Sequence, residues 1–403
     1  MRTLILLPLA ATLACASTKT EQRIGGVGGD GSASNTAGVV IETKAGVIAV
    51  GTKGEKGQAD PLLKLWDLET HAPTHTLDGH QGQVSALAFF AKGRRLASGD
   101  SQGTVRIWDV DTGDLVRSLK CPALPARQRR AKASKAPSGS YKGRASVLAL
   151  AISPDEQFIA ASCRGDDTGG PSTFVLYPDN VQVWELSTGQ SQHTLGASDS
   201  VKPYRTVSFS GDGKKLAACV WFSSPGGMSM WDLANGQRLE MPPVDCWGAQ
   251  FLQDGRRVVV HNNRHQLRVQ GLDNGEVVEL ALGDRSATVA LSLKVAAGAD
   301  VIASGSNHDE VWVWAEVDGA WVRSVRKADN LTSYALSADG TMLAFLTQPS
   351  VSRDGTYDTS PSTEGMVHIL PTPAHGDPTP STWQPWSVTG LRGRVTSVAI
   401  APR

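Results

Sequence analysis

The sequence predicts an all-β protein built from seven repeats, each a four-stranded antiparallel sheet. Three observations lead to this prediction. A short apolar segment ending in Trp-Asp, or in a variant of it, recurs along most of the 403 residues. A turn that contains Gly often follows at a constant offset, and a pair of apolar segments joined by a short turn precedes most copies. Self-similarity at a fixed period indicates a repeat architecture.

The Trp-bearing segment marks the third strand of each repeat. Five copies carry Trp in the same slot, and we assign these side chains to core packing: Trp66, Trp108, Trp184, Trp231 and Trp314. Two copies are degenerate. One covers residues 269–272, with Gln270 in the Trp slot, and the other covers residues 369–371. Together the copies predict seven repeats.

Tight turns separate the expected strands. Five of them follow third strands: Thr112-Gly113, Thr188-Gly189, Asn235-Gly236, Asn274-Gly275 and Asp318-Gly319. First and second strands are joined by turns of the kind seen at Asp212-Gly213. Glycine supplies the positive φ that a tight hairpin needs. The segments between turns alternate apolar and polar residues or are apolar throughout, as expected for sheets stacked face to face.

The second repeat is the most complete, and it resembles a WD repeat. It runs from Gly79-His80 through two apolar strands to Trp108-Asp109. In WD repeats a Gly-His pair precedes the first strand, and His, Ser, Asp and Trp often form a buried hydrogen-bond network. His80, Ser98 and Trp108 match that network, whereas Gln102 stands where Asp is usual. We therefore interpret His80 as a satisfied core histidine and not as a ligand or base.

The resemblance implies a seven-bladed β-propeller over residues 38–403, in which each sheet is one blade. Residues 394–402 read as a first strand with no second strand after it, and residues 46–51 as a second strand without a complete first one. We expect the C-terminal strand to pair into the N-terminal blade and close the ring, which leaves no long edge exposed. Residues 39–42 compete for the same position, and the sequence leaves this choice open.

The N-terminus resembles the signal of a bacterial lipoprotein. Arg2 precedes an apolar run over residues 4–13 that is too short to span a bilayer. The segment Leu-Ala-Cys-Ala-Ser at residues 13–17 resembles a lipobox, although Thr12 stands where Leu is commonest. The resemblance implies a signal peptide over residues 1–14, a diacylglycerol on Cys15 and an outer-membrane location. Residues 15–37 are rich in Gly and Ser and are expected to be a flexible tether. A plain secretory signal and a cytosolic protein are the alternatives.

Four further cysteines, Cys121, Cys163, Cys219 and Cys246, make an even count, which permits disulfides in an exported chain. Cys219 lies in an expected second strand, at the position that Gly99 and Ser162 take in other repeats. Small positions within strands are usually buried free thiols. We therefore expect free thiols rather than disulfides.

The composition gives little indication of chemistry. The chain has 39 basic and 39 acidic residues, so its net charge favours neither nucleic acid nor an anionic surface. It contains no Gly-x-Ser-x-Gly elbow and no His-Glu-x-x-His pair. His261 and His265 flank an expected hairpin rather than lying on a helix, which argues against a metal site. We expect a monomer that is not an enzyme and holds no cofactor or metal.

Long insertions interrupt the repeats after second or fourth strands, at residues 51–61, 121–145, 164–180, 222–227 and 347–365. In a propeller, loops of these two types share one face. Binding residues concentrate on loops that a rigid scaffold positions, and repeat folds place insertions on one face. We therefore predict that this face binds the partner.

The longest insertion is strongly basic. It carries seven cations with no acidic residue between them: Arg127, Arg129, Arg130, Lys132, Lys135, Lys142 and Arg144. This charge predicts a docking loop for an acidic protein partner or for anionic lipid, and nucleic acid is not expected for an exported chain. The sequence thus favours a non-catalytic, lipid-anchored scaffold in the bacterial envelope. The alternatives are an envelope enzyme or small-ligand binder with a site at the channel mouth, and a cytosolic scaffold.

Overall fold

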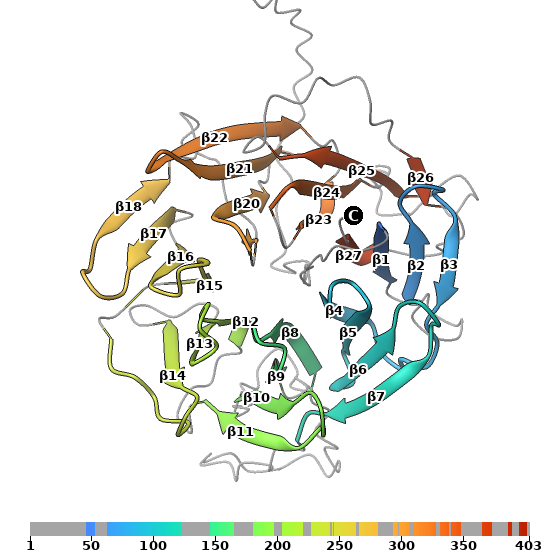
Figure 1. The fold of residues 1–403 in the computed structure, drawn as a ribbon, viewed down its shortest axis with the longest axis horizontal. Helices are drawn as coiled ribbons and strands as arrows, with labels where there is room; N and C mark the ends of the chain where they lie inside the picture. Colours follow the sequence, from blue (N-terminus) through green and yellow to red (C-terminus); the bar gives the residue numbers. More distant parts are fainter. Residues whose placement is uncertain are drawn as a thin grey trace, which may run out of the picture. The chain divides into compact units, whose positions relative to one another are not determined.

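The structure is a computed structural model. It describes the following residues: 46–52, 63–122, 146–164, 180–196, 204–220, 227–241, 244, 246–262, 266–280, 293–296, 298–305, 310–327, 331–337, 340–347, 365–372, 386–388 and 395–400. Residues 35–403 form one compact unit, and the described part of it consists of strands and turns (Figure 1). The described strands form seven antiparallel sheets. The predicted signal peptide, Cys15 and the tether lie outside the described residues.

The first three sheets contain the N-terminal strands together with the last strand of the chain. The first sheet has the order β27 (Val395–Ile400), β1 (Val47–Thr52), β2 (Leu63–Asp67) and β3 (Pro73–Thr76). The second has β4 (Val84–Phe90), β5 (Arg95–Asp100), β6 (Thr104–Asp109) and β7 (Leu115–Lys120). The third has β8 (Ser146–Ile152), β9 (Phe158–Arg164), β10 (Asn180–Glu185) and β11 (Ser191–Leu195).

The other four sheets follow in chain order. The fourth has β12 (Tyr204–Phe209), β13 (Lys215–Val220) and β14 (Met228–Asp232). The fifth has β15 (Gly248–Phe251), β16 (Arg257–His261), β17 (Leu267–Gly271) and β18 (Val277–Leu280). The sixth has β19 (Lys294–Val295), β20 (Val301–Gly305), β21 (Glu310–Val317) and β22 (Ala320–Lys327). The seventh has β23 (Leu331–Leu336), β24 (Met342–Thr347), β25 (Gly365–Pro371) and β26 (Trp386–Val388).

The last strand pairs with the first one. β27 lies antiparallel to β1, with Ile48 opposite Ile400 and Gly51 opposite Ser397. β27 therefore occupies the position next to β1 for which residues 39–42 also competed. Residues 39–42 lie outside the described part of the chain.

The fourth sheet corrects the expectation of four strands in every repeat, because its described part has three. Contacts with the free edge of β14 are present but irregular, and the farthest of them is a hydrogen bond from the Met228 N–H to the carbonyl oxygen of Val244 at 3.3 Å. Arg238 forms an isolated bridge with Trp231, and the Leu239 N–H donates to the carbonyl oxygen of Met230 at 2.8 Å. The sequence then reads Pro242-Pro243. Proline has no N–H to donate to a ladder, so regular pairing with β14 cannot extend through this pair.

The core lies between neighbouring sheets. The five Trp residues of the predicted third-strand slot are buried, with exposed fractions between 1% for Trp66 and 4% for Trp184. Trp184 belongs to a cluster that also contains Ala97 and Val105 of the second sheet. These side chains close the space between two sheets, which is how sheets with two apolar faces are stabilised.

Consecutive sheets touch through their first strands. β4 contacts β8, β8 contacts β12, β12 contacts β15, β15 contacts β19, and β19 contacts β23. β23 then contacts β27, and β27 contacts β4, so the series of contacts returns to its start. Figure 1 lets the reader follow this order by colour from blue to red.

The turns have the backbone that their sequences predict. Gly113 and Gly236 follow third strands with φ of 76° and 70°.

In the third sheet, Glu156 takes a positive φ of 56° between β8 and β9. Its carboxylate accepts a hydrogen bond from the Ala91 N–H of the second sheet at 2.7 Å. This contact between sheets helps to hold a backbone conformation that is unfavourable for a residue with a Cβ.

Candidate functional site

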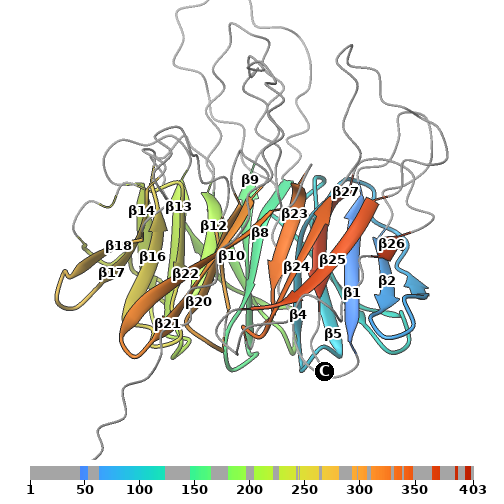
Figure 2. The ribbon, with the colours of Figure 1, turned by 90° about the horizontal axis from the view of Figure 1, so that it is seen from above.

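The strand ends of each sheet gather at two edges, which Figure 2 shows from the side. One edge carries Thr52, Cys121, Arg164, Val220 and Thr347, and each of these residues stands at the root of a long insertion. We call it the insertion edge. The opposite edge carries the turns between first and second strands, and we call it the turn edge. The seven basic residues predicted to dock a partner (Arg127, Arg129, Arg130, Lys132, Lys135, Lys142 and Arg144) lie outside the described residues.

Hydrogen bonds align the insertion edge from sheet to sheet. Ser85, near the start of β4, donates its hydroxyl to the carbonyl oxygen of Val147 in β8. Ser162, near the end of β9, donates to the carbonyl oxygen of Tyr204 in β12. Both serines are buried, so these bonds satisfy polar groups that would otherwise be costly. They place the insertion-edge ends of the second, third and fourth sheets next to one another.

Two disulfides correct the expectation of free thiols. Cys121 is bonded to Cys163, with the two Cα atoms 5.8 Å apart. Cys219 is bonded to Cys246, with the Cα atoms 6.1 Å apart. All four cysteines are buried, and each bond joins segments of neighbouring sheets at the insertion edge. The roots of three insertions are therefore covalently tied to the scaffold.

The positions of the cysteines within the repeats are the signal that would have identified these bonds. Cys163 and Cys219 lie near the ends of second strands, whereas Cys121 and Cys246 lie in connections that lead to the first strand of the next sheet. These two classes of position meet at the insertion edge. The small size of the strand position, taken alone, indicated burial but could not indicate a partner from the next sheet.

Arg164 and Arg205 bring positive charge to the same edge. Arg164 is the last residue of β9, and Arg205 is the second residue of β12. Both are half-buried. Burial, with a further contribution from the charge of Arg164, lowers the pKa of Arg205 to about 10. Neither arginine was singled out as a docking residue from the sequence, because the repeat pattern does not show which strand residues of two sheets approach each other.

The buried polar network of the second sheet contains a carboxylate, that of Asp100, which was not identified from the sequence. His80 contacts Asp100 through Nδ1 at 2.9 Å and Ser98 through Nε2 at 2.6 Å. Trp108 donates its indole N–H to Ser98 at 2.8 Å. Asp100, not residue 102, thus supplies the acidic member. His80, Ser98 and Asp100 are at most 1% exposed, so this group holds the strands together and faces no ligand.

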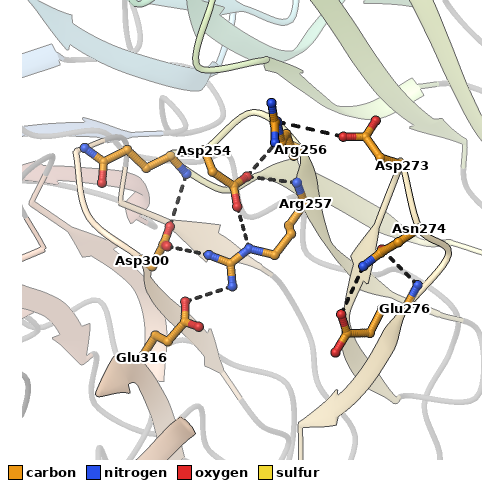
Figure 3. A network of polar contacts seen from close by, with 9 residues as sticks. Asp254, Arg256, Arg257, Asp273, Asn274, Glu276, Asp300 and Glu316 are labelled. Carbon is orange, nitrogen blue, oxygen red and sulfur yellow. Dashed lines mark hydrogen bonds and ion pairs between the residues drawn. The ribbon is translucent and has the colours of Figure 1, made fainter. Parts of the chain in front are cut away.

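A second charged network lies at the turn edge (Figure 3). Arg257 of the fifth sheet pairs with Asp254 beside it and, at 2.8 Å each, with Asp300 and Glu316 of the sixth sheet. Burial raises the pKa of Asp300 against the opposing effect of Arg257, and the charges of Asp254 and Glu316 raise it further. Because Arg257 is held by three carboxylates, this network joins two sheets rather than offering a free cation.

Two further kinds of site concern metal ions and membranes. Within the described residues, no group of three or more His, Cys, Asp and Glu side chains is arranged to hold a metal ion. The same part of the chain has no helix of sufficient length and apolarity to cross a membrane. His261 is buried, and His265 lies outside the described residues.

Comparisons with known proteins find WD40 repeats in this chain. The family model described as WD domain, G-beta repeat matches residues 71–109 and 135–168. The first match covers most of the repeat that contains Trp108. The sequence resemblance to WD repeats is thereby confirmed for these segments.

Three relatives show the extent of the similarity. Apoptotic protease-activating factor 1 of Rattus norvegicus is 42% identical over 144 residues, which is 36% of this chain and 9% of that protein. Target of rapamycin complex subunit wat1 of Schizosaccharomyces pombe is 26% identical over 180 residues, which is 44% of this chain and 45% of that protein. Guanine nucleotide-binding protein subunit beta of Oryza sativa subsp. indica is 33% identical over 95 residues, which is 23% of this chain and 24% of that protein. The chain thus spans less than half the length of each. WD-repeat proteins are generally non-catalytic scaffolds for protein interactions.

Proposed function

We propose that this chain is a closed, seven-bladed propeller that acts as a non-catalytic scaffold and docks a protein partner at the insertion edge. The observation that carries this proposal is the pair of disulfides, which ties the roots of the long insertions to neighbouring sheets. Loops on a rigid base bind partners with a smaller loss of entropy than loops on a mobile one. WD40 repeats, which are typical of interaction scaffolds, agree with this role.

Ring closure is supported by the two ends of the described fold. β27 pairs with β1, and it also contacts β23 of the seventh sheet and β4 of the second. The pairing covers the inner edge of β1, which would otherwise present unpaired backbone groups to solvent. A closed ring of seven blades accounts for all of these contacts.

Export to an envelope is the second part of the proposal. Disulfides persist in oxidising compartments and are rare in the cytosol. Two buried disulfides therefore favour an exported chain. The lipobox-like segment around Cys15 adds a lipid anchor, and the outer membrane is the favoured location. The relatives named above come from eukaryotes, so export depends on the features of this chain and not on them.

The basic insertion supplies the attraction for the partner. Its seven cations all lie within the 23 residues that follow Cys121. Clustered charge of one sign raises the rate of encounter with an oppositely charged surface and depends on ionic strength. An acidic protein is thus the expected partner.

The test compares two variants of the full-length exported protein. In the first, all seven basic residues of the insertion are changed to Gln. In the control, which removes charge from the opposite edge, four exposed cations (Lys92, Arg94, Lys214 and Arg256) are changed to Gln. Cross-linking in cells followed by purification should recover a discrete acidic partner with the wild type and the control, and lose it with the first variant. Equal recovery with all three proteins would reject docking by the insertion.

The mass of the N-terminal fragment of the cell-derived protein tests the location separately. A fragment that begins at Cys15 and carries acyl mass is the expected result. A fragment that begins at Met1 would reject the lipid anchor and leave a cytosolic scaffold as the better reading.

A further inference from the structure

We propose that β22 is a dimerisation edge, which pairs antiparallel with β22 of a second copy of this chain and places Ser324 of one copy opposite Ser324 of the other. This inference goes beyond the proposed function, because it concerns the outer strand of the sixth sheet and not the insertion edge. It predicts a dimer, whereas the sequence led us to expect a monomer.

The outer strand of the sixth sheet presents a long and regular edge. β22 comes last in the order of its sheet, and Figure 1 shows it as the outermost strand there. It spans eight residues, whereas the outer strands β3, β7, β11, β18 and β26 span three to six. The pairing of β3, β7 and β11 with their neighbours contains a register shift, and the pairing of β22 with β21 contains none. Short length and bulges keep sheet edges from pairing with other chains, and β22 has neither device.

The turn between β21 and β22 determines which backbone groups point outward. Asp318-Gly319 has φ of 52° and 77° and joins residues 317 and 320 as a two-residue hairpin. A hydrogen-bonded pair closes such a hairpin, and pairs of this kind alternate with non-hydrogen-bonded pairs along the strands. The N–H and C=O groups that point away from β21 are therefore those of residues 321, 323, 325 and 327. The outward carbonyl oxygen of Val325 is reached by the guanidinium of Arg326 at 3.2 Å, a bond that an N–H of the second copy replaces.

The charges of β22 select one register of self-pairing. The strand carries three cations and no acidic residue. With Ser324 opposite Ser324, every cation faces an uncharged residue: Arg323 faces Val325, Arg326 faces Val322, and Lys327 faces Trp321. A shift of the centre by one residue places Arg323 opposite itself or opposite Lys327, and like charges directly opposite each other are destabilising.

The same register covers the apolar side chains that β22 exposes. Val322 and Val325 are 52% and 39% exposed. In the proposed pairing, Val322 packs against the aliphatic stem of Arg326 from the second copy. Val325 packs in the same way against Arg323, because long cationic side chains cover apolar surface with their methylene groups. Removal of this surface from water favours association.

Ser324 supplies an independent observation that the edge takes a partner. Its hydroxyl oxygen is buried and has no hydrogen-bond partner among the described residues. A buried hydroxyl that makes no hydrogen bond is unfavourable. In the proposed register the two Ser324 side chains stand opposite each other in a non-hydrogen-bonded pair, where serine hydroxyls can bond across the strands.

Site-directed cross-linking tests this register on the full-length protein. The Cα atoms of a non-hydrogen-bonded pair lie about 4.5 Å apart, which is within the range of a disulfide. Ser324→Cys should therefore give a covalent dimer on mild oxidation, seen by non-reducing electrophoresis, and peptide mass mapping should locate the bond at position 324. Ser118→Cys changes an exposed serine of the outer strand β7 and should give no such dimer. The wild type reports any cross-link through Cys15.

Sedimentation equilibrium measures the association itself. Val322→Lys places a cation opposite Arg326 of the second copy and should raise the Kd of the dimer about tenfold or more. High salt should recover part of the loss, because it screens exposed charges. Val116→Lys changes a valine of β7 that is 48% exposed, and it should leave Kd unchanged. Circular dichroism of each variant verifies that the fold is retained.

Three results would overturn the proposal. A wild type that sediments as a monomer up to its solubility limit, with no covalent dimer from Ser324→Cys, would show that no second copy binds at this edge. Dimerisation that Val322→Lys leaves unchanged would place the contact elsewhere. A monomeric wild type that loses a protein partner in cells through Val322→Lys would assign the edge to a strand of that partner. Docking at the insertion edge is tested separately, by recovery of a partner through the basic insertion.

Discussion

Cys121 and Cys163 belong to neighbouring sheets, and their bond closes a loop whose ends are 42 residues apart in sequence. The loop contains the whole basic insertion. A cross-link of this kind stabilises a fold by about 2–4 kcal/mol, mainly by restricting the unfolded chain. Because the bond lies where the long polar insertion begins, it also keeps that edge of the sheet packed.

The first prediction concerns this bond. Cys121→Ser combined with Cys163→Ser should lower the free energy of unfolding by about 2–4 kcal/mol, as measured by urea denaturation. Reductant should lower the stability of the wild type further, because it also opens the bond between Cys219 and Cys246. Unchanged urea midpoints in the double variant would contradict the structure at this position.

The second prediction concerns thiol reactivity. Denatured, non-reduced protein should expose no thiol among Cys121, Cys163, Cys219 and Cys246 to iodoacetamide, and reduction should expose all four. Mass spectrometry of the alkylated peptides gives the count. Free thiols at these positions in the cell-derived protein would contradict the two disulfides.

The third prediction concerns Asp100. Burial opposes the charge of this carboxyl, but hydrogen bonds from His80 and from the N–H groups of Thr104 and Gln102 hold its pKa below the usual value of 3.8. A lowered pKa stabilises the fold at pH values above 3.8, and this contribution is lost as the pH falls through the folded-state pKa. Asp100→Asn should therefore cost about 3–5 kcal/mol at pH 7 and less at pH 3.

Gln102→Ala is the matched control for that variant. The resemblance to WD repeats assigned the acidic position of the network to residue 102, whereas the structure assigns it to Asp100. Guanidinium chloride unfolding at both pH values should show a small effect of Gln102→Ala, below about 1 kcal/mol. An effect as large as that of Asp100→Asn would contradict the observed network.

The fourth prediction concerns Lys294. Burial lowers the pKa of this ammonium group in β19 from 10.5 to about 8. The folded state therefore releases the proton before the unfolded state does, and stability rises between pH 8 and 10.5. Lys294→Met should raise the melting temperature at pH 7, and the gain should disappear above pH 10.5. A gain that is independent of pH would show that packing, and not charge, is responsible.

The fifth prediction concerns the network of Figure 3. Arg257→Met leaves Asp254, Asp300 and Glu316 close together without their shared cation, so it should cost about 1–3 kcal/mol at pH 7. The cost should shrink at pH 3.5, because burial raises the pKa of Asp300 and this carboxyl is then largely protonated. Arg256→Met removes a neighbouring guanidinium that is mostly exposed and 3.8 Å from Asp273, and it should change stability little. Calorimetry at the two pH values measures both effects.

The sequence predicted the repeat and much of its local structure for physical reasons that act within a few residues. Trp108 and its counterparts mark third strands, and turns such as Asn235-Gly236 supply positive φ at hairpins. Relations between repeats were harder to predict. The disulfide partners, the approach of Arg205 to Arg164 and the shared carboxylates of Arg257 all depend on which side chains of two sheets meet, and periodicity within one sheet does not contain that information.

The described part of the fourth sheet has no regular fourth strand, and this feature lies between these cases. Pro242-Pro243 was visible in the sequence and argues against a ladder, but the repeat pattern alone favoured a complete sheet. The predicted docking residues of the basic insertion remain a prediction, because they lie outside the described residues.

The pairing of β27 with β1 delays completion of the first sheet until late in synthesis. During synthesis, β1 emerges long before β27, so the first sheet cannot be completed until almost the whole described chain has left the ribosome. Until then the nascent protein lacks one of its most distant contacts, and such contacts slow folding. If the chain is exported as we propose, late completion of the first sheet keeps it competent for passage through a translocation channel until it reaches a compartment where its cysteines can be oxidised.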